Sequence, residues 1–134
     1  MKLPRSRIIR ASTDFAKVRK MGRTFAGRYL LIGVVRREGR PHQGERPRFG
    51  FVTPKYVGGA VQRNLVRRRF KALAVELGDS IDGPFDVVTV ARRPAGNASY
   101  ARLLNDWVKT ARKAKLLPKD FRLPEPSQSK EGEA

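Results

Sequence analysis

The spacing of apolar residues predicts a central amphipathic helix. Val66, Phe70, Leu73 and Leu77 recur at the interval of one helix face, which is typical of a helix that buries that face. The pair Gly58-Gly59 precedes this pattern and Gly78 follows it. Because glycine favours turns and helix ends, we expect the helix to begin just after Gly59 and to end near Gly78.

Three further segments have the composition of β-strands. Residues 28–37 and 48–53 are rich in β-branched and aromatic residues, and pairing them as a hairpin is the economical arrangement. Residues 85–91 are almost continuously apolar, which indicates a strand covered on both faces.

Two more helices flank this region. Ser12 or Thr13 is the expected cap of a short helix over 14–21, and Asn97 or Ser99 is the expected cap of a long helix reaching about residue 115. Tyr100 and Trp107 fall on the apolar side of the long helix and are interpreted as core residues.

The predicted order is helix, strand, strand, helix, strand, helix. This order favours an α+β two-layer sandwich of helices on a small sheet, in which the strand–helix–strand unit over 48–91 makes a parallel pair. We expect one domain over 1–116, with a basic, irregular arm at 1–11. Residues 117–134 are rich in proline, serine and charge, and they are predicted to be a partly disordered tail.

Charge indicates an anionic partner. The 134 residues include 30 Lys and Arg against 12 Asp and Glu, so the formal net charge is +18. Such an excess opposes folding by self-repulsion, and nucleic acid is the leading candidate for the partner. A membrane surface is the second candidate. However, no apolar run approaches the ~20 residues of a spanning helix, and the N-terminus does not resemble a signal peptide.

Residues that support metal or thiol chemistry are scarce. Cysteine is absent, which excludes disulfides and thiolate sites and is compatible with a cytoplasmic location. The single histidine, His42, falls in a loop rich in glycine and proline, where an exposed side chain is expected. The carboxylates are scattered without metal-binding spacing, so neither catalytic residues nor a metal site are predicted in the protein. A nuclease whose carboxylates converge on Mg²⁺ only in the folded state is the less favoured alternative.

The polar side of the central helix is the main candidate for binding. No acidic residue interrupts it before Glu76, and its members are Arg63, Asn64, Arg67, Arg68 and Lys71. Arginine forks bind phosphate in a bidentate manner, so this face suits a polyanion. The alternative is a solvated basic face. Phe15 is either a core residue of the first helix or a stacking surface for an unpaired base, beside Arg10 and Arg19.

Together these segments resemble the protein subunit of bacterial ribonuclease P. The family pattern around its signature helix runs roughly S-x-K-x-x-G-x-A-V-x-R-N-R-x-K-R, and residues 53–68 read TPKYVGGAVQRNLVRR. Similar segments lie on both sides: Asp14-Phe15 with Val18 and Gly22, and FDVVTVARRPA at 85–95 followed by Tyr100. The likeness spans about residues 7–116 in the same order.

The resemblance implies a fold similar to the second domain of ribosomal protein S5, with a βαβ crossover. It implies a subunit of a ribonucleoprotein endonuclease that removes the 5′ leader of precursor tRNA, in which the RNA subunit holds Mg²⁺ and performs catalysis. The partners are then the catalytic RNA and precursor tRNA, with neither a membrane nor a small-molecule substrate. By position, the catalytic RNA would be contacted by Lys55, Arg63, Asn64, Arg67 and Arg68. Phe15 would lie in the cleft for the leader.

Three positions depart from the family pattern. Leu65 replaces a usual arginine, a loss for which Arg69 is a candidate substitute. Arg19 stands where an aromatic residue is frequent, which favours phosphate attraction over stacking, and Gly59 replaces a common asparagine. The alternative function is that of a structural RNA-binding protein of ribosomal type, without a role in cleavage.

Overall fold

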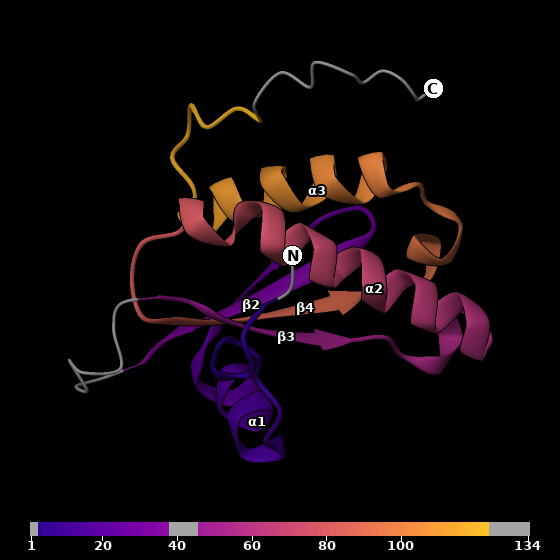
Figure 1. Ribbon diagram of the computed structural model, residues 1–134, viewed down its shortest axis with the longest axis horizontal. Coiled ribbons are helices and arrows are strands. Elements are labelled where there is room, and N and C mark those ends of the chain that lie inside the picture. The colour runs from indigo at the N-terminus through magenta and orange to yellow at the C-terminus, as the bar shows by residue number, and fades with distance from the viewer. Residues whose placement is uncertain (1–2, 38–45, 124–134) are drawn as a thin grey trace.

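A four-stranded sheet organises the residues that the computed structural model describes, 3–37 and 46–123 (Figure 1). The strands are β1 (Arg23–Ala26), β2 (Leu30–Arg36), β3 (Arg48–Val52) and β4 (Phe85–Ala91), and their order across the sheet is β1-β2-β4-β3. β2 is antiparallel to both β1 and β4, whereas β3 is parallel to β4. The predictions for His42 and for the end of the tail fall outside the described residues.

Helices cover the two faces of the sheet unequally (Figure 1). α2 (Ala60–Leu77) and α3 (Tyr100–Lys113) lie on one face, while the shorter α1 (Ser12–Met21) lies on the other. The main core forms between the sheet and the helices α2 and α3. A smaller cluster of Ile9, Val18 and Val88 forms under α1. The mixed α+β sandwich is therefore confirmed, and α1 adds a partial layer on the second face.

The central helix agrees with its prediction. α2 begins at Ala60 and ends at Leu77, and its four stripe residues are each at most 2% exposed. Burying a side chain of this size contributes about 1.5–3 kcal/mol, so the stripe fixes which face of α2 turns outward. The predicted parallel pair is β3 and β4, joined through α2, and β4 spans the predicted residues 85–91.

The last helix also follows its pattern. The Ser99 hydroxyl accepts a hydrogen bond of 3.2 Å from the Arg102 amide, which identifies Ser99 as the cap. Trp107 is buried, and its indole Nε1 donates to the Thr89 hydroxyl at 2.9 Å. The helix ends at Lys113, two residues before the predicted end, and the chain buries Leu116 and Leu117 beyond it.

Three predictions about the first half of the chain are wrong. The strands at 28–37 and 48–53 do not form a hairpin, because β4 lies between β2 and β3. β2 pairs instead with β1, a strand that was not predicted. The cap of α1 is neither Ser12 nor Thr13: both lie inside the helix, whose preceding residue is Ala11.

A buried carboxylate ties the strands together at one end of the sheet. Asp86 is 2% exposed and accepts hydrogen bonds from Arg48 at 2.9 and 2.7 Å and from Arg37 at 3.0 Å. Hydrogen bonding to Asp86 is the largest influence on the Arg48 guanidinium and raises its pKa. Arg48 also lies 3.5 Å from Asp14 of α1, so one ionic cluster links β3, β4 and α1.

Candidate nucleic-acid interface

The outward side of α2 is a basic surface. Asn64, Arg68 and Lys71 are exposed, whereas Arg63 and Arg67 are partly buried. Lys55 is exposed in the 3-10 turn η3 (Lys55–Val57), which precedes α2. We call these six residues the α2 basic face. The structure thus places five of the predicted residues on one helix and the sixth at the turn that leads into it.

The positive charge of this face is not neutralised by acidic side chains within the described residues. The ion pairs found there join Arg37 and Arg48 to Asp86, Arg48 to Asp14, and Arg46 to Asp79. None of these pairs includes a cation of the α2 basic face. A helix side with several unpaired cations suits a polyanion, because an arginine can contact two phosphate oxygens at once.

Arg69 lies on a different side of α2. Its Nη1 donates a hydrogen bond of 2.7 Å to the Ala98 carbonyl oxygen, just before α3. This contact ties the two helices together and argues against Arg69 as the substitute for the arginine that Leu65 replaces.

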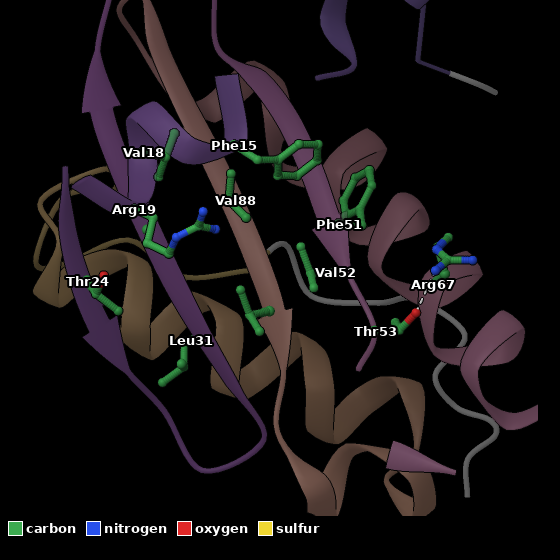
Figure 2. Close-up of a pocket in the computed structure, with 12 residues that line it drawn as sticks. Phe15, Val18, Arg19, Thr24, Leu31, Phe51, Val52, Thr53, Arg67 and Val88 are labelled. Carbon is green, nitrogen blue, oxygen red and sulfur yellow. Dashed lines mark hydrogen bonds between the residues drawn. The ribbon is translucent and has the colours of Figure 1, made fainter. Parts of the chain in front are cut away.

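A pocket opens between α1 and the sheet (Figure 2). Its volume is about 600 Å³, and its lining comes from α1, from all four strands, and from one residue of α2. The lining residues are Phe15, Val18, Arg19, Thr24, Leu31, Gly33, Phe51, Val52, Thr53, Arg67, Val88 and Val90. Apolar side chains dominate, with cationic groups at Arg19 and Arg67. Such a lining can contact base and ribose surfaces while its cations attract phosphate.

Phe15 has the packing role predicted for it and also lines the pocket, while stacking on an unpaired base stays a prediction. Its ring packs against the small core cluster under α1 and also lines the pocket. The ring lies directly over Gly50, where an added Cβ would be only 2.7 Å from Cε1 of the ring. Arg19 lines the same pocket, but Arg10 is exposed and does not.

Arg67 connects the pocket with the α2 basic face. Its Nη2 donates a hydrogen bond of 2.7 Å to the hydroxyl oxygen of Thr53, which is 6% exposed at the end of β3 (Figure 2). The contact holds the guanidinium at the pocket wall, although Arg67 belongs to α2. The two predicted surfaces therefore meet at one residue.

Sequence reasoning missed most of the pocket wall. Thr24 comes from the unpredicted strand β1, and Leu31 and Val90 come from strands whose pairing was predicted incorrectly or left open. Thr53 was predicted as the last residue of the strand over 48–53 and as part of the family pattern, but not as a binding residue. Alternate residues of β2 and β4 line the pocket, but the almost continuously apolar sequence of β4 does not indicate which of its faces carries it.

The described residues contain neither a candidate metal cluster nor a candidate membrane-spanning helix. Across 3–37 and 46–123, no group of three or more His, Cys, Asp or Glu residues lies close enough to hold a metal ion. Within the same residues, no helix has the length and apolar character needed to cross a membrane.

Known proteins match both the sequence and the fold. The family model described as Ribonuclease P matches residues 3–115. The ribonuclease P protein component of Syntrophomonas wolfei is 31% identical over 112 residues, covering 84% of this chain and 90% of that protein. The corresponding protein of Chloroflexus aurantiacus is 35% identical over 111 residues, covering 82% of this chain and 78% of its own.

Solved structures support the fold. The RNase P protein of Staphylococcus aureus superposes with a TM-score of 0.73 at 22% identity, covering 83% of this chain and 97% of that one. The RNase P protein of Thermotoga maritima gives 0.66 at 18% identity, covering 75% and 91%. The family match confirms the resemblance and disfavours a ribosomal structural protein. The chain belongs to the family of ribonuclease P protein components, the protein subunits of the ribonucleoprotein endoribonuclease that processes tRNA.

Proposed function

We propose that the α2 basic face binds the catalytic RNA of ribonuclease P and that the pocket under α1 binds the 5′ leader of precursor tRNA. One observation carries the proposal: Arg67 belongs to both surfaces. A phosphate near Arg67 would lie at the junction between the two RNAs, where the leader leaves the cleavage site. The catalytic RNA then contacts the other residues of the α2 basic face, which are Lys55, Arg63, Asn64, Arg68 and Lys71. The leader contacts Phe15 and Arg19.

In this proposal the RNA subunit carries out the cleavage reaction. Following the family resemblance, Mg²⁺ belongs to the RNA subunit, and the protein contributes binding and screening rather than a reacting group. Unpaired cations lower the cost of bringing two polyanions together, so the protein should reduce the concentration of Mg²⁺ that cleavage requires. The cytoplasmic location stays a prediction.

Reconstitution tests the first half of this proposal. The purified protein is added to its cognate catalytic RNA, and precursor-tRNA cleavage is followed as the Mg²⁺ concentration is lowered. We expect stimulation that grows at low Mg²⁺, and a smaller stimulation with Arg68→Ala. Arg68 is exposed, and among residues 3–37 and 46–123 it takes part in none of the ion pairs, so this variant should melt like the wild type. Equal cleavage with and without protein at low Mg²⁺ would exclude the assigned role.

A series of leader lengths tests the second half. Phe15→Leu removes the aromatic ring but keeps an apolar side chain over Gly50, so it should weaken binding only of precursors whose leader reaches the pocket. Stacking on an aromatic side chain contributes about 1–3 kcal/mol per base, which corresponds to a loss of fivefold or more. Precursors with a single leader nucleotide serve as the control. A loss independent of leader length would mean that Phe15 acts only through the fold.

Arg10 and Arg19 form a matched pair for the same assay. Both are exposed arginines near α1, yet only Arg19 lines the pocket. Arg19→Gln should weaken long-leader binding more than Arg10→Gln. An equal effect of both substitutions would extend the leader path beyond the pocket to Arg10, as the sequence predicted.

A further inference from the structure

An exposed aromatic ring lies beside the α2 basic face. Tyr56 follows Lys55 in η3, and it is 49% exposed. The other exposed large apolar residues in the described part of the chain are Met21 and Val61, neither of which is aromatic. An exposed Leu or Met needs no explanation. A half-exposed ring within a basic surface, however, offers a planar apolar face that water solvates poorly and that another planar group can cover.

One side of this ring is already occupied by a cation. The Arg93 guanidinium carbon lies 5.5 Å from the centroid of the Tyr56 ring. Arg93 opens the 3-10 segment η5 (Arg93–Asn97), which connects β4 to α3 and is far from Tyr56 in sequence. A guanidinium over one face polarises the ring and leaves the opposite face for a second planar group.

The two segments that carry this pair are packed against each other. Gly96 lies so close to Val57 that an added Cβ would be 2.4 Å from the Val57 carbonyl oxygen. Gln62 of α2 donates a hydrogen bond of 3.2 Å to the Gly96 carbonyl oxygen. The main core buries Val57, which follows Tyr56, and Ala95, which belongs to the same segment as Arg93. Tyr56 and Arg93 thus project from a fixed base, which reduces the entropy lost when a ligand binds.

The charge around the ring favours RNA over protein as its partner. Lys55 is exposed next to it, and Arg92 and Arg93 are exposed in the neighbouring segment. Arg63 of the α2 basic face is also close in the chain: its amide donates a hydrogen bond to the carbonyl oxygen of Gly59, three residues after Tyr56. Within the described residues, none of these cations is in an ion pair. An aromatic ring surrounded by cations is the arrangement that binds single-stranded nucleic acid.

We propose that Tyr56 and Arg93 form a stacking platform for one unpaired base of the catalytic RNA, with Lys55 on the adjacent phosphate. This inference rests on the proposed binding of that RNA by the α2 basic face. It adds a contact that depends on the planar surface of a base and not on charge alone. The platform also gives the β4–α3 connection a role in binding, which the pattern of the α2 helix does not predict.

The experiment measures the Kd of the full-length protein for its cognate catalytic RNA as a function of salt. Tyr56→Phe keeps the ring and should bind like the wild type, whereas Tyr56→Leu should bind about 5- to 150-fold more weakly, the range found for the loss of one stacked base. The slope of log Kd against log salt should not change in Tyr56→Leu, because no phosphate contact is lost. In Lys55→Ala the slope should fall by about 0.7–0.9. Melting temperatures verify that each variant is folded.

Val61→Ala is the control for a general apolar contact, since Val61 is 83% exposed in the first turn of α2 and is not aromatic. Unchanged affinity of Tyr56→Leu would overturn the platform, and so would an equal loss in Tyr56→Phe or in Val61→Ala. Chemical probing of the bound RNA adds a second readout: one nucleotide should become reactive in the Tyr56→Leu complex and stay protected with Tyr56→Phe. Failure of the wild-type protein to bind the RNA would instead reject the proposed function, together with the platform built on it.

Discussion

Arg67 makes the most specific prediction at the scale of single residues. Arg67→Ala removes a cation that both surfaces share, so it should weaken binding of the catalytic RNA and flatten its salt dependence. The log–log slope should fall by about 0.7–0.9 if one phosphate contact is lost. Nitrocellulose filter binding at several salt concentrations measures both quantities.

Thr53→Val separates the charge of Arg67 from its position. The substitution removes the hydroxyl that accepts the 2.7 Å hydrogen bond from Arg67 but leaves the cation in place. Affinity should fall while the salt slope stays near that of the wild type. If Arg67→Ala leaves the slope unchanged, the arginine belongs to a solvated surface and its contact with RNA is disproved.

Asp86 leads to a prediction about stability. Asp86→Ala would leave Arg37 and Arg48 without their shared, 2% exposed partner. Breaking a buried pair costs at most about 3–5 kcal/mol, and Arg37 and Arg48, whose side chains are 15% and 27% exposed, would lose their shared partner. Urea unfolding followed by circular dichroism measures the loss. Asp14→Ala is the matched control: its contact with Arg48 is longer and more exposed, so it should cost about 1 kcal/mol or less. Similar losses in the two variants would contradict the assigned role of Asp86.

At the scale of elements, a tyrosine joins the two helices of the main layer. The Tyr100 hydroxyl of α3 donates a hydrogen bond of 2.7 Å to the Glu76 carboxylate of α2. Burial, followed by the contact with Glu76, raises the pKa of Tyr100 well above its ordinary value of 10.0. Above pH 10, the unfolded chain therefore loses this proton while the folded chain keeps it. The contribution of Tyr100 to stability is complete below that pH and declines as the pH rises.

Comparison with Tyr100→Phe isolates this effect from other groups that titrate at high pH. The wild type should be more stable than the variant at neutral pH, and the difference in unfolding free energy should shrink as the pH increases beyond 10. Urea denaturation at a series of pH values measures this difference. A difference that stays constant across the series would mean that the hydroxyl is not held in its protonated form by the fold.

The elements differ in how far the sequence predicts them. α2 and β4 were predicted closely because their apolar patterns are long and are bounded by glycine or proline. β1 has only four residues, of which Phe25 alone is partly buried, so no pattern distinguishes it from a loop. The hairpin failed for another reason: the preference for neighbouring strands to pair ignores the later strand β4, whose two buried faces require a central place in the sheet.

The same distinction applies to the candidate site. The α2 basic face was predictable because a helix converts sequence spacing directly into a surface. The pocket was not, because its wall combines α1, four strands and one residue of α2. Phe15 shows this limit: its type and neighbours allowed two roles, and only the fold shows that its ring lies over Gly50, packs against the small cluster and still lines the pocket.

At the scale of the whole molecule, positive charge has opposite consequences for folding and for binding. The formal net charge of +18 disfavours the compact state, because folding brings like charges together. Two of the acidic residues are used locally: Asp86 holds strands together, and Asp106 accepts hydrogen bonds from the Arg28 and Tyr29 amides. The basic surfaces consequently stay uncompensated within the described residues, which is useful only if a polyanion completes the assembly.

This balance predicts opposite salt dependences for the free protein and the complex. Screening acts over about 10 Å at 0.1 M salt, so added salt should relieve self-repulsion and raise the melting temperature of the free protein. The same salt should weaken RNA binding, because the entropy gained when counterions leave the RNA falls as the salt concentration in solution rises. Saturating catalytic RNA should raise the melting temperature most at low salt, since a ligand that binds only the folded state stabilises it by mass action.

Differential scanning fluorimetry with and without RNA over a range of potassium chloride concentrations measures both trends. Sucrose, which carries no charge, controls for effects on hydration. If salt lowered the melting temperature of the free protein, self-repulsion would not limit its stability, and the unpaired cations would have no cost for RNA to offset.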